Sequence, residues 1–272
     1  MITRAVASLL DDTQLSETTE PLVVGPAVEH ESRWQDPGST STIRIRKLTR
    51  SGDSLVSRRM AAGQPFVEPQ GNLSRGYLAW KRFFDLFGTL CLLLFLAPVI
   101  LATLLVLMVT TRGKPLFWQD RTGYLGRPFR MCKFRTMRSG ATAMRHKIPN
   151  EKDGPVFKNR HDPRVTRIGR FLRKTSIDET PQLFNVLLGQ MSLVGPRPIV
   201  VHEAAQFKPW HRPRLAVVPG LTCFWQVSGR SEIGFEDWMR MDIRYVRRQS
   251  LKTDVWLLLK TPLSVLSGRG AY

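Results

Sequence analysis

The side chains best suited to chemistry lie in a dense charged run between Asp162 and Gln182. Arginines recur there at every third position, and on a helix this spacing forms one drifting basic stripe: Arg164, Arg167, Arg170 and Arg173. Two adjacent acids, Asp178 and Glu179, follow the stripe. We expect Asp178 to stay ionised, with a lowered pKa, because cations and the positive end of a helix lie beside it. An ionised carboxylate in a cationic field suits phosphate-bearing substrates.

The same acids also have an ordinary structural explanation. Ser176 can cap a helix that runs to Gly189, and Glu179 stands three positions later, as in a capping box. Asp178 would then be a common first-turn acid. For Glu179 the capping role and a chemical role can hold together.

Short elements are expected to position these residues. Residues 115–121 and 128–134 flank a glycine-containing turn and predict a β-hairpin. Residues 138–160 predict a helix with a mobile loop around 150–154, and the prolines at 196 and 198 predict a rigid turn that presents Arg197. Further expected elements are a short helix at 200–207, a loop with a short strand at 219–230, and a helix at 235–249. An amphipathic helix at 252–266 either lies flat on a membrane or packs into the core.

An apolar segment without any charged residue covers 86–111, a length of 26 residues. About 20 apolar residues suffice to span a bilayer, so we interpret this segment as membrane-embedded. Pro98 lies near its middle, lacks an N–H and clashes with the Leu94 carbonyl, which predicts a kink or break. Basic residues flank both ends, and such residues prefer the cytoplasm. A re-entrant helix that enters and leaves by one face is favoured over a spanning helix, which stays an alternative.

Charge is unevenly distributed over the 272 residues, whose formal net charge is +19. Residues 1–74 carry a net charge of −1 and residues 75–272 a net charge of +20. The first part shows no sustained periodicity and is expected to be a disordered extension. The basic part would attract nucleic acid, an anionic membrane or phosphate-bearing substrates. Three widely spaced cysteines exclude a disulfide framework and a cysteine-based zinc site.

Two other classes of function share the basic charge. A nucleic-acid-binding protein would not need the apolar segment, and no nucleic-acid-binding motif occurs. A non-catalytic basic peripheral membrane scaffold would keep that segment but would have no use for Asp178 and Glu179 beside Arg173 and Arg197.

Over residues 77–272 the sequence resembles the bacterial sugar transferases, which are monotopic polyprenyl-phosphate phosphoglycosyl transferases. The motifs that carry the resemblance occur in one order along the chain: KFRTM at 133–137, DPRVTRIG at 162–169, SIDETPQ at 176–182, NV at 185–186, MSLVGPRP at 191–198, PGLT at 219–222, WQVSGR at 225–230 and GAY at 270–272. This resemblance implies transfer of a hexose 1-phosphate, from UDP-glucose or UDP-galactose, to undecaprenyl phosphate. The products would be the lipid diphosphate sugar and UMP, initiating exopolysaccharide synthesis.

The resemblance also implies roles for individual residues. Asp178 would be the nucleophile that forms a phosphosugar-aspartyl intermediate, and Glu179 a general base or metal-orienting group. Mg²⁺ would assist, with Asp178 and Glu179 as its protein ligands. The membrane segment would be re-entrant and broken at Pro98.

Binding roles are implied for a second group of residues. Arg197 and Arg173 would hold phosphate, and Lys133 and Arg135 would bind the diphosphate. Trp225, Gln226 and Arg230 would contact the nucleotide or the sugar. The partners expected are the UDP-sugar, undecaprenyl phosphate and anionic membrane lipids, without nucleic acid; the sequence leaves the oligomeric state open, a dimer included.

The expected fold is α+β and mainly helical: a monotopic membrane protein with a re-entrant helix, a small β-hairpin and interfacial amphipathic helices. Three parts are expected: an extension at 1–74, the membrane helix with its flanks at 75–112, and a catalytic domain at 113–272. The expected location is the bacterial inner membrane, with the catalytic domain on the cytoplasmic face.

Overall fold

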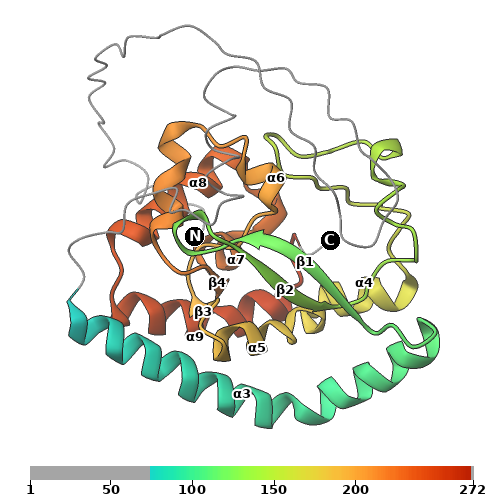
Figure 1. The fold of residues 1–272 in the computed structure, drawn as a ribbon, viewed down its shortest axis with the longest axis horizontal. Coiled ribbons are helices and arrows are strands. Elements are labelled where there is room, and N and C mark those ends of the chain that lie inside the picture. The colour runs from blue at the N-terminus through green and yellow to red at the C-terminus, as the bar shows by residue number, and fades with distance from the viewer. Residues whose placement is uncertain (1–73, 271–272) are drawn as a thin grey trace, which may run out of the picture. The chain divides into compact units, whose positions relative to one another are not determined.

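A computed structural model of the chain describes residues 74–270, which are mainly helical with two small sheets (Figure 1). The extension expected at 1–74 lies, except for Ser74, outside the described residues.

The apolar segment forms one long helix, α3 (Arg75–Thr110), which begins where the Ser74 hydroxyl accepts a hydrogen bond from the Tyr77 N–H. Pro98 lies inside the helix, which continues through it and curves near its middle (Figure 1). A complete break is therefore not observed. Proline removes one backbone hydrogen bond, and curvature relieves the clash of its ring with the preceding turn.

Both halves of α3 contact the same domain. In the first half, Asp85 accepts hydrogen bonds from the Ser192 hydroxyl (2.9 Å) and the Leu193 N–H (3.0 Å), and Lys81 pairs with Asp254 (3.1 Å). In the second half, Leu107 is buried against Phe134 and Leu172. The helix thus lies along one side of the domain, with α5 (Gln182–Leu187) and α9 (Leu251–Ser267) beside its first half (Figure 1).

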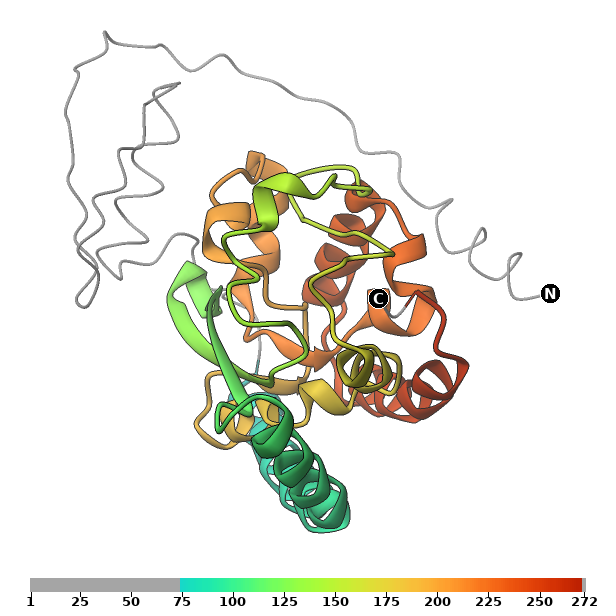
Figure 2. The same ribbon diagram turned by 90° about the vertical axis from the view of Figure 1, so that its right-hand side faces the viewer.

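The outer face of α3 is apolar and uncovered in the described part of the chain. Near its middle, Leu94 and Phe95 are 81% and 78% exposed. Figure 2 shows the helix projecting from one side of the other elements. By length and composition α3 is the one described helix that could cross a membrane.

The predicted hairpin is confirmed. Strands β1 (Leu116–Thr122) and β2 (Pro128–Phe134) pair antiparallel, with Leu116 opposite Phe134 and Thr122 opposite Pro128. The turn between them contains a single 3₁₀ turn, η1 (Tyr124–Gly126).

A second, parallel sheet joins β3 (Ser192–Val194) to β4 (Gly220–Thr222). Its backbones approach so closely that a β-carbon on Gly220 would lie 2.0 Å from the Gly195 nitrogen. Only glycine fits there, and this approach fixes the turn after β3 that carries Arg197.

The helix predicted from Ser176 to Gly189 is wrong in its first half. Helix α4 (Arg167–Lys174) ends, Ser176 takes a left-handed conformation (φ 57°), and a 3₁₀ turn, η3 (Ile177–Glu179), follows. Helix α5 begins only at Gln182. The Ser176 hydroxyl caps nothing, so the capping box does not form. Gly189, with φ 76°, follows the helix end as expected.

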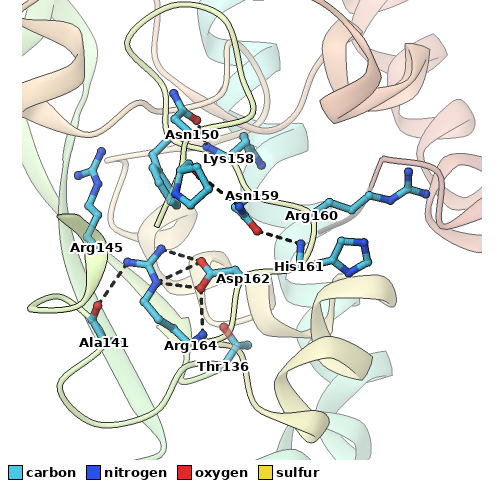
Figure 3. A network of polar contacts seen from close by, with 12 residues as sticks. Thr136, Ala141, Arg145, Asn150, Lys158, Asn159, Arg160, His161, Asp162 and Arg164 are labelled. Atoms are coloured by element: carbon cyan, nitrogen blue, oxygen red, sulfur yellow. Dashed lines mark hydrogen bonds and ion pairs between the residues drawn. The ribbon is translucent and has the colours of Figure 1, made fainter. Parts of the chain in front are cut away.

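The helix predicted within 138–160 is also wrong. The described segment consists of turns and one 3₁₀ turn, η2 (Arg145–Lys147). Side-chain hydrogen bonds replace helical ones here: Asn150 binds several backbone groups of the segment (Figure 3). Glu203 accepts a further one from the Phe157 N–H. Arg164 precedes α4 and does not join the other arginines of the expected basic stripe. Its guanidinium instead donates hydrogen bonds to the carboxylate of Asp162.

The remaining elements surround the main core. They are α6 (Val201–Ala204), η4 (Pro209–Ala216), α7 (Phe224–Ser228), η5 (Arg230–Glu232), α8 (Phe235–Arg247) and α9. The helices expected at 235–249 and 252–266 are confirmed, whereas α7 was not foreseen. In α9, Leu257 packs into the core as one alternative expected, whereas Leu263 and Leu266 are exposed; that this exposed face lies on a membrane stays a prediction.

Candidate active site

Glu179 is held between two cations. Its carboxylate accepts a hydrogen bond from Lys133 Nζ (3.0 Å), from Arg197 Nη1 (3.0 Å) and from Arg197 Nη2. Burial acts to raise the pKa of Glu179, but the charges of Arg197 and Lys133 and their hydrogen bonds lower it well below its usual value. Glu179 is therefore ionised and bound to both cations.

Asp178, its neighbour, stands in a different environment. It is 7% exposed and forms no ion pair within residues 74–270. Burial and the adjacent charge of Glu179 raise its pKa to about 6, although Lys133, Arg173 and Arg197 act in the opposite direction. The expected lowering of this pKa is therefore wrong, because the prediction ignored burial and the second carboxylate.

The η3 turn explains how both acids reach the site. Ile177 packs against the cluster of Leu107, Phe134 and Leu172, which ties the turn to α3. The carboxylates of Asp178 and Glu179 are left to face the cations of β2 and the β3 turn.

Arg197 is positioned by groups on three elements. Its carbonyl accepts a hydrogen bond from Arg214 Nη2 (2.6 Å), and Arg214 forms a buried ion pair with Asp242 (2.7 Å). Its guanidinium lies 5.8 Å from the ring centroid of Trp225, which stacks on Trp238. This support makes the fork of Arg197 a rigid donor for anions.

Three other predicted residues lie around this centre. Arg173 donates from Nε to the Thr136 hydroxyl (3.0 Å) and acts electrostatically on Asp178. Arg230 donates to the Ser176 hydroxyl (3.4 Å), beside the η3 turn. Gln226 accepts from the Cys223 thiol (3.4 Å), so its amide contacts a residue that lies near Arg197.

Arg135 does not join this group. Its guanidinium donates to the carbonyls of Lys114 (2.7 Å) and Leu116 (3.1 Å), and so it fastens the open end of the hairpin. Residues 133 and 135 would share one face if β2 continued, because side chains alternate along a strand. The strand ends at Phe134, so Arg135 does not follow Lys133 into the site.

Sequence reasoning missed Lys158. Its ammonium lies 5.6 Å from the Trp225 ring centroid and is electrostatically coupled to Lys133, Arg173 and Arg197. The available signal was the apolar pair Val156–Phe157, directly before Lys158 in an otherwise polar stretch. Val156 is buried in the core, and this brings the following residues towards the site.

The carboxylates of the site fit a metal ion that is held partly by the protein and partly by substrate. No three His, Cys, Asp or Glu side chains form a metal-binding cluster in the described part of the chain. Mg²⁺ is often held by one or two carboxylates together with substrate phosphates and water. The unpaired carboxylate of Asp178, next to Glu179, fits that mode.

Comparison with known sequences gives the family. The sequence pattern of the family described as "Bacterial sugar transferase" matches residues 76–268. This range is most of the chain and includes every site residue above. The chain belongs to the bacterial sugar transferase family. The resemblance that its motifs indicated is thereby confirmed.

Several curated proteins are similar to this sugar transferase. The galactosyl transferase CpsE of Streptococcus agalactiae is 42% identical over 72% of this chain and 44% of its own length. The undecaprenyl-phosphate galactose phosphotransferase of Salmonella typhimurium is 39% identical over 75% of this chain and 44% of its own. This chain thus spans less than half of these relatives. The exopolysaccharide production protein ExoY of Rhizobium meliloti is 35% identical over 80% of this chain and 100% of its own length.

Proposed function

We propose that this sugar transferase is a phosphoglycosyl transferase that moves a hexose 1-phosphate from a UDP-sugar to undecaprenyl phosphate, producing UMP and starting an exopolysaccharide or related glycan. The single observation that carries the proposal is Asp178, a buried carboxylate without an ion pair among the cations of the site. Relatives named for galactose and for glucose transfer support a hexose.

Asp178 and Glu179 have different roles in this proposal. Glu179, fixed between Lys133 and Arg197, holds the cations in place and orients the site. Asp178 is the better nucleophile, because its carboxylate is the more basic and forms no ion pair with a basic side chain of the described residues. In the first step an oxygen of Asp178 bonds to the β-phosphorus, and the bond from that phosphorus to the bridging oxygen breaks. UMP leaves with the electron pair.

The second step restores the enzyme. A phosphate oxygen of undecaprenyl phosphate bonds to the same phosphorus, the bond to Asp178 breaks, and the carboxylate is free again. Throughout both steps Arg197, Lys133 and Arg173 stabilise charge that develops on the phosphoryl oxygens. We assign contacts with the nucleotide or the sugar to Arg230, which lies beside the η3 turn, and to Gln226, which lies beside Cys223.

We include Mg²⁺ in the proposal, held by Asp178 and Glu179 together with substrate phosphates. When bound, the ion neutralises phosphate charge. EDTA should abolish UMP release and added Mg²⁺ should restore it; full turnover after chelation would remove the metal from the account.

The membrane arrangement supports the same function. The exposed apolar face of α3 suits burial among lipid chains, where undecaprenyl phosphate resides. Contacts of both halves of α3 with one domain support a re-entrant helix over a spanning one. A location on the cytoplasmic face of the inner membrane, beside anionic lipids, follows from the basic flanks.

One assay separates this function from a non-catalytic membrane scaffold. The purified chain is incubated with Mg²⁺, undecaprenyl phosphate and each of a panel of UDP-sugars, and UMP is measured. We expect lipid-dependent UMP release with UDP-glucose or UDP-galactose. If none of the UDP-sugars in the panel gives UMP, the scaffold is favoured. If an N-acetylated UDP-sugar gives UMP, the hexose assignment must be corrected.

A further inference from the structure

Lys158 is a cation in the site for which the described residues provide no anion. Its Nζ lies over the Trp225 ring, on which Arg197 also packs, and Lys158 forms no ion pair within residues 74–270. Other cations of the site have acceptors: Lys133 and Arg197 bind Glu179. Lys158 is therefore a surplus charge at the centre.

The segment that carries Lys158 is held firmly. The Asn150 amide oxygen accepts from the backbone N–H of Lys158 (2.8 Å) and of Lys152 (3.2 Å), and its amide nitrogen donates to the Val156 carbonyl (3.2 Å). Figure 3 shows Asn150 lying against the backbone of Lys158. The Phe157 N–H donates to buried Glu203 (3.2 Å). This anchoring is unlike the mobile loop that the sequence suggested.

The charges around Lys158 come from four elements. Arg197 follows β3, Lys133 lies on β2 and Arg173 on α4, and all three repel the ammonium. Only Glu179 of η3 attracts it, and that carboxylate already binds two cations. Burial and the repulsion of the three cations together lower the pKa of Lys158 to about 7. An arriving anion would relieve both effects.

We propose that Lys158 is a substrate-binding residue that contacts a phosphate group on the Trp225 side of the site, with Asn150 as its positioning residue. The proposal rests on the proposed function. Two phosphates share the required chemistry, the diphosphate of the UDP-sugar and the monoester of undecaprenyl phosphate.

The first test measures anion binding without any turnover. Inorganic pyrophosphate is titrated calorimetrically into the full chain in detergent and into Lys158→Gln. The matched control is Lys147→Gln, an exposed lysine of η2. Because a hydrogen bond to a charged group is worth about 1.5–3 kcal/mol, Lys158→Gln should bind roughly tenfold more weakly or worse, and the control should bind like the original chain.

The dependence on pH sharpens this test. Raising the pH from about 6.5 to about 9 removes the proton from free Lys158. The ratio of the pyrophosphate affinity of the original chain to that of Lys158→Gln should therefore fall towards one. Titration of pyrophosphate itself is common to both proteins and cancels in their ratio. Asn150→Ala should weaken binding less than Lys158→Gln, and Lys158→Arg should retain most of it.

Kinetics then identify the source of the phosphate. A raised KM for the UDP-sugar alone assigns Lys158 to the diphosphate, and a raised KM for undecaprenyl phosphate alone assigns it to the lipid. Equal pyrophosphate affinity of the original chain and Lys158→Gln, or no pyrophosphate binding by the original chain, would overturn the proposal. An enzyme that releases no UMP would instead refute the proposed function, while the pyrophosphate result would still stand.

Discussion

At the scale of the residue, two adjacent carboxylates acquire different properties from their contacts. Glu179 binds Lys133 and Arg197, which hold its charge, whereas Asp178 is buried beside that charge without a cation of its own. Identical functional groups thus separate into an orienting group and a reactive one.

The environment of Asp178 predicts an acid limb in the pH profile. Its pKa is raised to about 6, so below this pH the carboxylate is protonated and cannot attack phosphorus. We expect kcat/KM for the UDP-sugar to fall about tenfold per pH unit below pH 6, measured as initial UMP release. A profile flat down to about pH 4, the usual range of an exposed carboxyl, would contradict the burial argument.

Glu179→Gln tests the orienting role. The change leaves the half-buried Lys133 and Arg197 without a counter-charge; breaking a fully buried pair in this way costs about 3 kcal/mol or more, so we expect a somewhat smaller loss here. We expect a lower free energy of unfolding together with a loss of activity. Glu232→Gln is the control, because Glu232 and its partner Arg269 are both exposed and such pairs contribute about 1 kcal/mol or less. Equal stability of the two variants would contradict the role.

At the scale of the element, the site depends on close backbone contacts that bring short segments together. The turn that carries Arg197 is packed through Gly195 against Gly220 of β4. The η3 turn is packed through Ile177 against α3.

Gly220→Ala should disrupt this arrangement. Its β-carbon would lie 2.0 Å from the Gly195 nitrogen, so the backbone must shift, and we expect about 1–3 kcal/mol of lost stability together with lower activity. Gly76→Ala in α3 is the control, since the nearest atom to its β-carbon would be 3.9 Å away. Thermal unfolding in detergent compares the two, and a Gly220→Ala chain as stable as the control would contradict the packing argument.

Elements with strong local signals were predictable, and those fixed by distant contacts were not. The hairpin and the helices at 235–249 and 252–266 follow from apolar periodicity. The capping box at Ser176 failed because Lys133 and Arg197, distant in sequence, bind Glu179. Motif resemblance located most of the site, but Lys158 depends on tertiary contacts of Asn150 and Val156 and carries little local signal.

At the scale of the whole molecule, we propose that α3 attaches the rest of the described chain to the membrane. Its polar residues Lys81 and Asp85 bind the domain, its second half packs on Phe134, and its outer face stays apolar. In the re-entrant arrangement proposed above, both ends of this helix lie on the side of the bilayer that holds the domain.

This attachment predicts the topology. Single cysteines are introduced at Arg75 and at Lys114, both exposed, in a chain without its native cysteines. A membrane-impermeant maleimide added to intact cells should label neither position, and permeabilisation should expose both. Labelling of one end alone would establish a spanning helix.

The measurement that tests the central claim most directly is the covalent intermediate. The chain is incubated with UDP-sugar and Mg²⁺ without any lipid acceptor, and UMP and protein mass are followed. We predict a stoichiometric burst of UMP and the added mass of a sugar phosphate on a peptide containing Asp178. Asp178→Asn, nearly the same shape, should remain folded and show neither. A label on another residue, or UMP release only when undecaprenyl phosphate is present, would contradict the two-step account.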